Sequence, residues 1–144
     1  MSEILLIRPL KLISILIFIL LTSCSLVKNN HTHDSEKKTA IEDFDAFYNK
    51  FYSDSIFQMS RIKFPLKGFL VDGLKQENWK KENWSTLKTK VFDIDTTMYM
   101  TDYIKTYKSF IEKVWIKDSG FFVEYGFKVI HRKWYLVYAV DQNL

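Results

Sequence analysis

The sequence predicts an α+β domain in which N-terminal helices pack on a curled antiparallel sheet. Two patterns favour this class: large apolar residues recur at helical spacing over 41–51, and runs of β-branched and aromatic residues fill the last third of the chain. Of the 144 residues, 47% are hydrophobic and 17% aromatic, which is typical of a packed globular protein. The length allows one folded domain, which we place at 39–144.

Before this domain, the sequence predicts a lipoprotein signal peptide over 1–23. Two basic residues precede an uncharged apolar run at 12–21, which is typical of a signal peptide and too short to span a bilayer. The run ends in L-T-S-C at 21–24, which resembles the lipobox of bacterial lipoproteins. The resemblance implies cleavage before Cys24, acylation of its thiol and anchoring to the membrane through the attached lipid.

The residues after the cleavage point predict a tether and an outer-membrane location. Ser25 stands where an aspartate would favour retention in the inner membrane of enterobacteria, so we expect a cell-envelope protein anchored in the outer membrane. Residues 24–38 hold the lipidated cysteine and a polar, unpatterned stretch that predicts a flexible tether. His31 and His33 could ligate a metal, but without a third ligand we interpret them as spacer residues, and no metal or cofactor is expected.

Two helices are predicted to open the domain. Thr39 and Glu42 match a capping box, and a helix over 40–53 follows from the spacing of the apolar residues. The S-x-x-Q signature at 55–58 predicts a second, short helix over 56–60.

The next segments predict a strand and a short helix. Residues 62–71 alternate in part, and their proline and glycine favour an edge strand or a bulge. A helix over 83–91 is predicted because Trp84, Leu87 and Val91 recur at helical spacing. Residues 98–113 fit helix and strand equally, although a strand is favoured toward their end.

The last third of the sequence predicts an antiparallel meander. The D-S-G sequence at 118–120 is a turn signal, and 121–130 is a run of β-branched and aromatic residues. His131 and its neighbours then reverse the chain into another strong strand at 133–140.

Helices followed by an antiparallel sheet resemble the nuclear-transport-factor-two-like, or cystatin-like, cone fold, whose last hairpin the residues H-R-K-W-Y-L-V-Y-A-V-D at 131–141 resemble. More narrowly, D-S-I-F-Q-M-S-R-I-K-F-P-L-K-G at 54–68, the tryptophans at 79 and 84 and D-I-D-T at 93–96 resemble a family of small uncharacterised envelope lipoproteins of Bacteroidota. This resemblance implies the fold and the envelope location, and it implies no catalytic residue.

Several functional classes lack support in the sequence. The net charge of +4 includes no basic block, so nucleic-acid binding is not expected. Enzymes of the cone fold commonly use an aspartate with a histidine, whereas His131 lies in a predicted turn; an aspartate acting without histidine stays an alternative. Asp93 and Asp95 could suggest a cation site, but the pattern is more typical of a loop or a strand start.

The leading hypothesis is a non-catalytic envelope lipoprotein that binds a small ligand or an envelope protein through its concave side. Arg61, at the predicted helix-to-strand junction, and Trp84, in a segment that could cover the cone, are the candidate ligand-binding residues. For Arg61 the structural alternative is an ion pair with Asp54 or another nearby acid, and for Trp84 it is packing in the core. A structural or inhibitor-like interaction protein with a filled cone is a further alternative.

Overall fold

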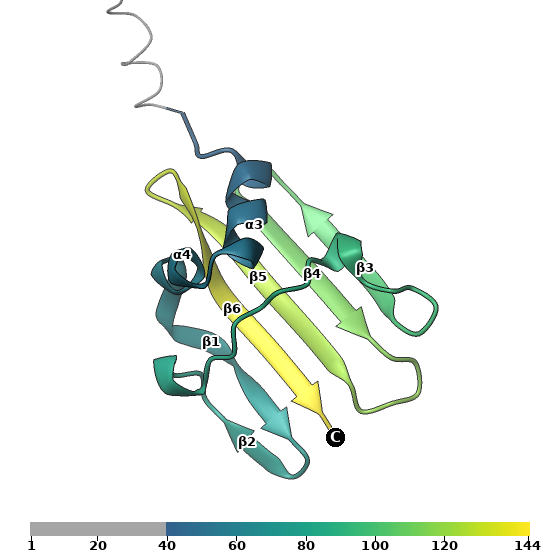
Figure 1. Ribbon diagram of the computed structural model, residues 1–144. Coiled ribbons are helices and arrows are strands. Elements are labelled where there is room, and N and C mark those ends of the chain that lie inside the picture. Colours follow the sequence, from purple (N-terminus) through teal and green to yellow (C-terminus); the bar gives the residue numbers. More distant parts are fainter. Residues whose placement is uncertain (1–39) are drawn as a thin grey trace, which may run out of the picture. The chain divides into compact units, whose positions relative to one another are not determined.

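The computed structural model describes residues 40–144, and the predicted signal peptide, Cys24, the tether with its two histidines and Thr39 lie outside them. The described residues form an α+β fold with helices on one face of a six-stranded sheet (Figure 1). The elements in chain order are α3 (Phe44–Ser53), α4 (Ser55–Ser60), β1 (Ile62–Asp72), β2 (Lys75–Glu77), the 3-10 helices η1 (Lys81–Asn83) and η2 (Val91–Asp93), β3 (Met100–Lys105), β4 (Ser109–Trp115), β5 (Phe122–Ile130) and β6 (Lys133–Asn143). No helix within these residues is long and apolar enough to cross a membrane.

The strands lie in the order β2-β1-β6-β5-β4-β3. The meander predicted for the last third is confirmed, because β3 to β6 pair as antiparallel neighbours, and residues 98–113 supply β3 and the start of β4. One pair departs from the expected antiparallel sheet, so the sheet is mixed. β1 runs parallel to β6, because the chain enters β1 from the helices and passes beside the last strand in the same direction.

The first helix begins at Phe44 and not at residue 40. Its N-cap is Asp43, whose carboxylate accepts a hydrogen bond from the Ala46 amide at 2.7 Å, so the predicted cap with Glu42 is wrong. The second helix, α4, is confirmed, but Asp54 caps it in place of Ser55 by accepting from the Phe57 amide at 2.9 Å. In both cases an aspartate is the cap in place of the expected hydroxyl residue: Asp43, four residues after Thr39, and Asp54, one residue before Ser55.

The strand predicted over 62–71, with an edge position or a bulge at its proline, is confirmed as β1. The register between β1 and β6 shifts between Ile62 and Lys67, around Pro65, as a bulge would require. The short β2 pairs only with Leu70 to Asp72, so among the described residues the rest of β1 has no strand on its outer side. The proline therefore lies where ladder hydrogen bonds are interrupted.

The helix predicted over 83–91 is wrong, because this segment is irregular between η1 and η2. The fully buried Gln58 side chain explains the difference. Its amide donates to the Leu87 carbonyl oxygen at 2.9 Å, and its carbonyl oxygen accepts from the Leu87 amide at 2.9 Å. These bonds take the place of the helical ones, so the segment crosses the sheet as an extended chain (Figure 1).

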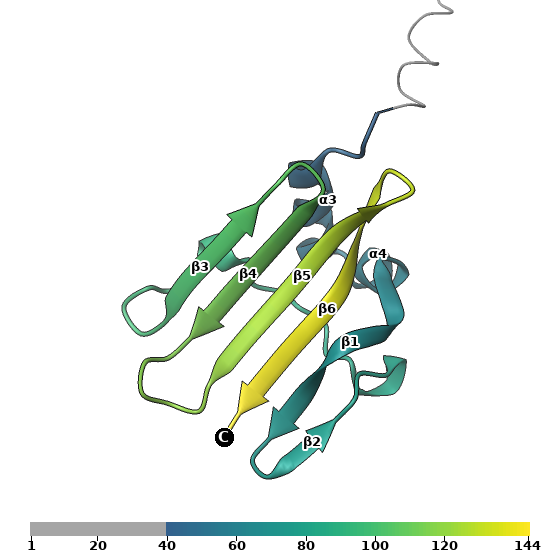
Figure 2. The ribbon, with the colours of Figure 1, turned by 180° about the vertical axis from the view of Figure 1, so that it is seen from behind.

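Helix α3 packs its aromatic face onto the middle of the sheet. Phe47 and Phe51 contact Phe127 of β5 with ring centroids 5.9 and 5.2 Å apart, and Phe110 of β4 and Leu136 of β6 are fully buried beside them. Seen from behind, no helix of the described residues lies on the other face of the sheet (Figure 2). The main core therefore lies on the helix face alone.

Candidate functional site

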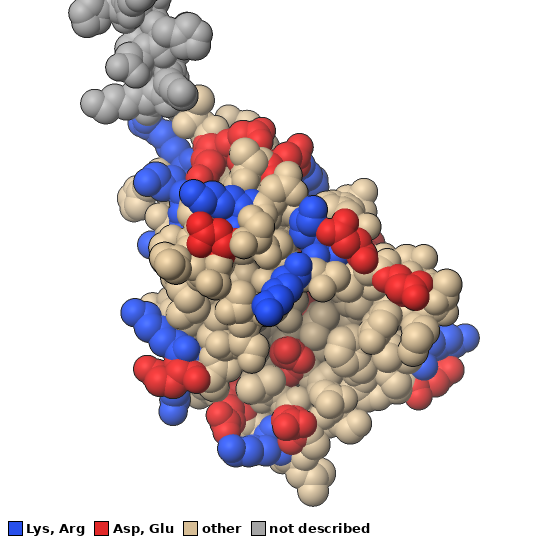
Figure 3. Space-filling model, in the orientation of Figure 1, with Lys and Arg blue, Asp and Glu red and all other residues tan. Residues whose placement is uncertain are grey.

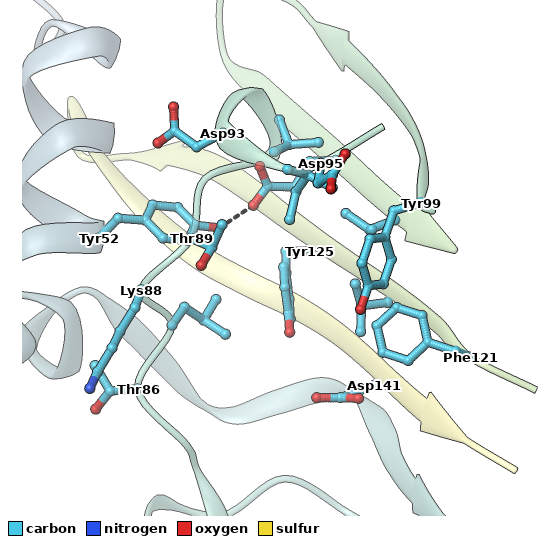
Figure 4. Close-up of a pocket in the computed structure, with 16 residues that line it drawn as sticks. Tyr52, Thr86, Lys88, Thr89, Asp93, Asp95, Tyr99, Phe121, Tyr125 and Asp141 are labelled. Carbon is cyan, nitrogen blue, oxygen red and sulfur yellow. Dashed lines mark hydrogen bonds between the residues drawn. The ribbon is translucent and has the colours of Figure 1, made fainter. Parts of the chain in front are cut away.

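A cavity of about 510 Å³ lies on the helix face of the sheet, beyond the end of α3. One wall is the segment 84–99, called the covering segment below, and the other is the ends of β4, β5 and β6. Figure 4 shows the lining side chains, and the space-filling view shows a hollow on this face with an acidic side chain in it (Figure 3). The apolar part of the lining comprises Leu87, Val91, Ile94, Val114, Phe121 and Val123.

Glu112 of β4 forms the floor of the cavity, where it is 2% exposed. The alternation of the strand explains its direction, because Phe110, Glu112 and Val114 point to the same face and all three are buried. Each oxygen of its carboxylate accepts a hydrogen bond: Oε2 from the Tyr48 hydroxyl and Oε1 from the Tyr52 hydroxyl. An inward carboxylate is thus held by two phenols.

The two tyrosines come from one face of α3, since residues four apart in a helix lie one above the other. The Tyr48 hydroxyl also accepts a hydrogen bond from the Val91 amide at 3.2 Å. This bond joins the helix and the sheet to the covering segment. The network therefore fixes the wall of the cavity as well as its floor.

Burial raises the pKa of the Glu112 carboxyl from 4.5 to about 7, although the bonds from Tyr48 and Tyr52 lower it. The pKa of both tyrosines is raised, chiefly by burial and then by the Glu112 charge. Near neutral pH the carboxyl therefore exchanges its proton readily, while the phenols stay protonated. Such a group can store charge or take up a proton inside the cavity.

Tyr125 of β5 and Asp141 of β6 complete the polar lining. Tyr125 is the register partner of Glu112, and Asp141 pairs with Val123, two residues further along β5, so all three side chains lie on one face. Burial raises the pKa of Tyr125, as do the nearby charges of Asp141 and Glu112, and burial together with Asp72 raises that of Asp141. Within residues 40–144, neither the Tyr125 hydroxyl nor the Asp141 carboxylate makes a hydrogen bond or ion pair.

The structure does not place Arg61 on the wall of this cavity. Its guanidinium makes two hydrogen bonds to the carboxylate of Glu42, at 2.7 and 2.9 Å, and one to the Trp134 carbonyl oxygen at 3.1 Å. It also lies over the Phe57 ring, 4.7 Å from the centroid. The expected structural ion pair is therefore present, with the nearby acid Glu42 as the partner, while Asp54 caps α4.

Trp84 lies closer to the cavity, but it is not one of the residues that line it. Its indole N–H donates to the Gln58 side-chain oxygen at 3.2 Å, and its ring contacts Trp79 and Tyr125 at centroid distances of 5.1 and 6.4 Å. Trp84 therefore supports the cavity from behind Tyr125. Arg61 and Trp84 are not brought together, and their binding of a ligand stays a prediction.

The pair Asp93 and Asp95 lies at the rim of the cavity. Asp93 pairs with Lys90 at 3.3 Å, and Asp95 accepts a hydrogen bond from the Thr97 amide at 2.9 Å, as in a loop turn. No cluster of three or more histidine, cysteine or acidic residues that could hold a metal exists in residues 40–144.

The comparisons with known proteins support this fold. A protein-family model described only as "-like" matches residues 42–143. The chain belongs to this "-like" family. None of the curated proteins matches the chain.

Three solved structures that are similar to this chain come from species of Bacteroides. A cystatin-like protein from Bacteroides caccae ATCC 43185 is 28% identical, with a TM-score of 0.57 over 71% of this chain and 77% of that one. A protein from Bacteroides uniformis ATCC 8492 is 25% identical, with a TM-score of 0.52 over 72% and 78%. A ntf2-like protein from Bacteroides fragilis NCTC 9343 is 20% identical, with a TM-score of 0.49 over 72% and 48%. The predicted fold class of helices on a sheet is confirmed.

Sequence reasoning missed the residues that line this cavity. Glu112 could have been found once 109–115 was taken as a strand, because a carboxylate between Phe110 and Val114 occupies an inward position. Asp141 gave no such signal. The register between β5 and β6 shifts at Gly126 and Phe127, and this shift changes which residues of β6 face the helices.

Proposed function

We propose that the chain is a cell-envelope lipoprotein, lipid-anchored at Cys24, whose folded domain binds a small ligand in the cavity above Glu112. The anchor rests on the sequence at 21–24. Ligand binding rests on one observation, which is a cavity of about 510 Å³ lined by apolar side chains with a few polar groups directed into it. Small-ligand sites typically have about 300–1,000 Å³ and this mixture of linings.

The cavity favours a ligand over a purely structural role. A filled cone would need side chains where the covering segment and the strand ends leave space, and a solid interior is what packing alone would select. Within residues 40–144 the Tyr125 hydroxyl and the Asp141 carboxylate have no partner, and they are the groups a ligand would satisfy.

An acid-base enzyme is the second candidate, and the raised pKa of Glu112, about 7, is the observation that favours it. Glu112 is only 2% exposed, and both of its oxygens already accept hydrogen bonds from tyrosines. A general base needs to reach the proton that it removes. Ligand binding is therefore the better supported function.

The anchor is tested with Cys24→Ala in the native host. We expect the variant to lose incorporation of a labelled fatty acid and to leave the membrane fraction, because the thiol is the attachment point. Ser25→Ala, next to it, is the control and is expected to keep the label. Label retained by Cys24→Ala would refute lipidation at this residue.

The cavity is tested by filling it. Val123→Phe adds a ring inside the cavity, whereas Val137→Phe makes the same change on the opposite face of the sheet. A panel of arylalkyl amines, alcohols and carboxylates is titrated into the full chain and followed by ligand-observed NMR. We expect at least one class to bind the wild type and Val137→Phe, with binding lost in Val123→Phe. Binding of no class, or equal binding to Val123→Phe, would contradict the proposed function.

A further inference from the structure

The charged groups of the cavity are unbalanced. Glu112 and Asp141 lie inside it, and Asp95 lies at its rim beside Asp93, which is paired with Lys90; Lys88 is the cationic side chain of the lining. Lys88 is exposed, and Figure 4 shows it pointing away from Tyr125 and Asp141. Among the described residues, neither inner carboxylate pairs with a lysine or an arginine. The interior of the cavity therefore has a negative potential when its acids are ionised.

The carboxylates of the cavity lie next to aromatic rings, and this arrangement favours one class of ligand. Tyr125 lies in register with Glu112 on one side, and Asp141 lies on the neighbouring strand on the other. In Figure 4 the hydroxyl end of Tyr125 and the Asp141 carboxylate lie on the same side of the cavity. Tyr99 and Phe121 pack edge to face at 5.7 Å and extend the aromatic wall. Carboxylates beside aromatic ring faces are the surroundings that a positively charged amine prefers.

We propose that the ligand of this cavity is a compact organic cation, with its ammonium group at the Asp141 carboxylate and the Tyr125 ring, and its apolar body against Val123 and Phe121. This inference rests on the proposed function, and it specifies the class of ligand. Glu112 contributes its charge from beneath, because its own oxygens are already engaged by tyrosines.

Other ligand classes fit the same groups less well. An anion would meet two carboxylates inside the cavity, while Lys88 of its lining points away from them. A metal ion would need three or more clustered ligands, and residues 40–144 offer no such cluster. A neutral alcohol could bond to Tyr125 and Asp141 but would leave the charge unbalanced.

The test compares two probes of equal size that differ in charge. 2-Phenylethylamine is protonated and 2-phenylethanol is neutral, and each is titrated into the full chain by calorimetry. The measurement is made at about pH 8, above the Glu112 pKa of about 7, so that both acids are ionised. We expect the amine to bind about tenfold or more tightly than the alcohol, as a charged hydrogen bond predicts.

The variant Asp141→Asn keeps the shape of the side chain and removes its charge. It is expected to fold, since burial already disfavours the charged form of this group. We expect it to weaken amine binding about tenfold or more and to leave alcohol binding nearly unchanged. Glu124→Gln is the matched control, because it removes one charge from the opposite face of the sheet, where Glu124 pairs with Lys113.

Three outcomes would overturn this inference. The alcohol could bind as tightly as the amine, Asp141→Asn could leave amine binding unchanged, or Glu124→Gln could weaken it as much as Asp141→Asn. If instead the panel above finds a neutral or anionic ligand that Val123→Phe excludes, the proposed function stands and the cationic class is wrong. Binding of no class contradicts both.

Discussion

The same three strands build two different environments on one face of the sheet. At the end beneath α3, β4, β5 and β6 contribute Phe110, Phe127 and Leu136, all fully buried. At the other end the same strands contribute Glu112, Tyr125 and Asp141 around a cavity. The first end is called the packed end below and the second the open end.

The length of α3 explains the difference between the two ends. The helix has ten residues, about 15 Å; its phenylalanines cover the packed end, and it reaches the open end only through Tyr48 and Tyr52, which bond to Glu112. The open end is covered by the irregular segment 84–99, which Gln58 holds in place through Leu87. Stability is thus concentrated at one end, which leaves the other end able to carry polar groups that would be costly in a close-packed core.

The largest loss of stability is expected from removing a buried ring at the packed end. Phe127→Ala removes a fully buried ring that contacts Phe47 and Phe51, and we expect it to lower the free energy of unfolding by about 3–5 kcal/mol. Val123→Ala, on the same strand at the open end, should cost only about 1 kcal/mol because it borders existing space. Urea unfolding measures both. Equal losses would show that the two ends are packed alike.

The open end predicts an unusual dependence of stability on pH. The folded-state pKa of Glu112, about 7, lies above its ordinary 4.5, so the folded state binds this proton more tightly than the unfolded one. The stabilisation from Glu112 is fully present below about pH 4.5 and is lost as the pH rises through about 7, a change of about 3 kcal/mol.

The variant Glu112→Gln isolates this contribution, because an amide of the same shape does not titrate. We expect the difference in unfolding free energy between wild type and variant to change by about 3 kcal/mol between about pH 4 and pH 8, in favour of the wild type at the acid end. Glu124→Gln, on the opposite face of the sheet, should show the same pH dependence of the unfolding free energy as the wild type. A wild type and Glu112→Gln with parallel profiles would contradict the burial of this charge.

Replacing Arg61 is expected to lower stability by a smaller amount and to leave ligand binding at the open end unchanged. Arg61→Met removes the bonds to Glu42 and Trp134, which should cost about 2 kcal/mol in unfolding free energy. The affinity for 2-phenylethylamine should not change, because Arg61 does not line the cavity. Lys67→Met, at an exposed position of β1, should cost less than about 0.5 kcal/mol. A loss of affinity in Arg61→Met would show that Arg61 takes part in ligand binding.

The smallest effect concerns the cap of α4. Asp54→Ala removes the acceptor for the Phe57 amide, and we expect a loss of about 1 kcal/mol in unfolding free energy. Ser55→Ala should cost less than about 0.5 kcal/mol, since the hydroxyl does not cap the helix. Both losses are measured by urea unfolding. A larger loss for Ser55→Ala than for Asp54→Ala would show that Ser55 caps the helix, as the sequence predicted.

The sequence predicted the elements whose pattern is set locally. The stripe at 44–53, the hairpin reversed at His131 and Arg132, and the strands on both sides of it follow from spacing and turn chemistry. Both turn residues have positive φ, of 47° and 67°, as a two-residue hairpin requires. These features need no knowledge of the rest of the chain.

The sequence failed where distant residues decide the structure. The segment 83–91 has a helical pattern, but the Gln58 side chain takes its backbone bonds from 29 residues away. Likewise, Arg61 occupies the predicted junction, and its direction is set by Glu42 and by the Trp134 carbonyl group. The inward direction of Asp141 depends on the register shift between β5 and β6. No local pattern carries that information.

The most direct test of the open end is a titration of its carboxyl groups in the full chain, with ¹³C-labelled glutamate and aspartate followed by NMR. We expect a midpoint near 7 for Glu112 and a midpoint above the ordinary 3.8 for Asp141, because Glu112 is buried, Asp141 is half-buried and neither has a cationic partner within residues 40–144. Midpoints near 4.5 for Glu112 and 3.8 for Asp141 would mean that water or a counter-charge reaches both groups, and the open end would not be the unbalanced cavity described here.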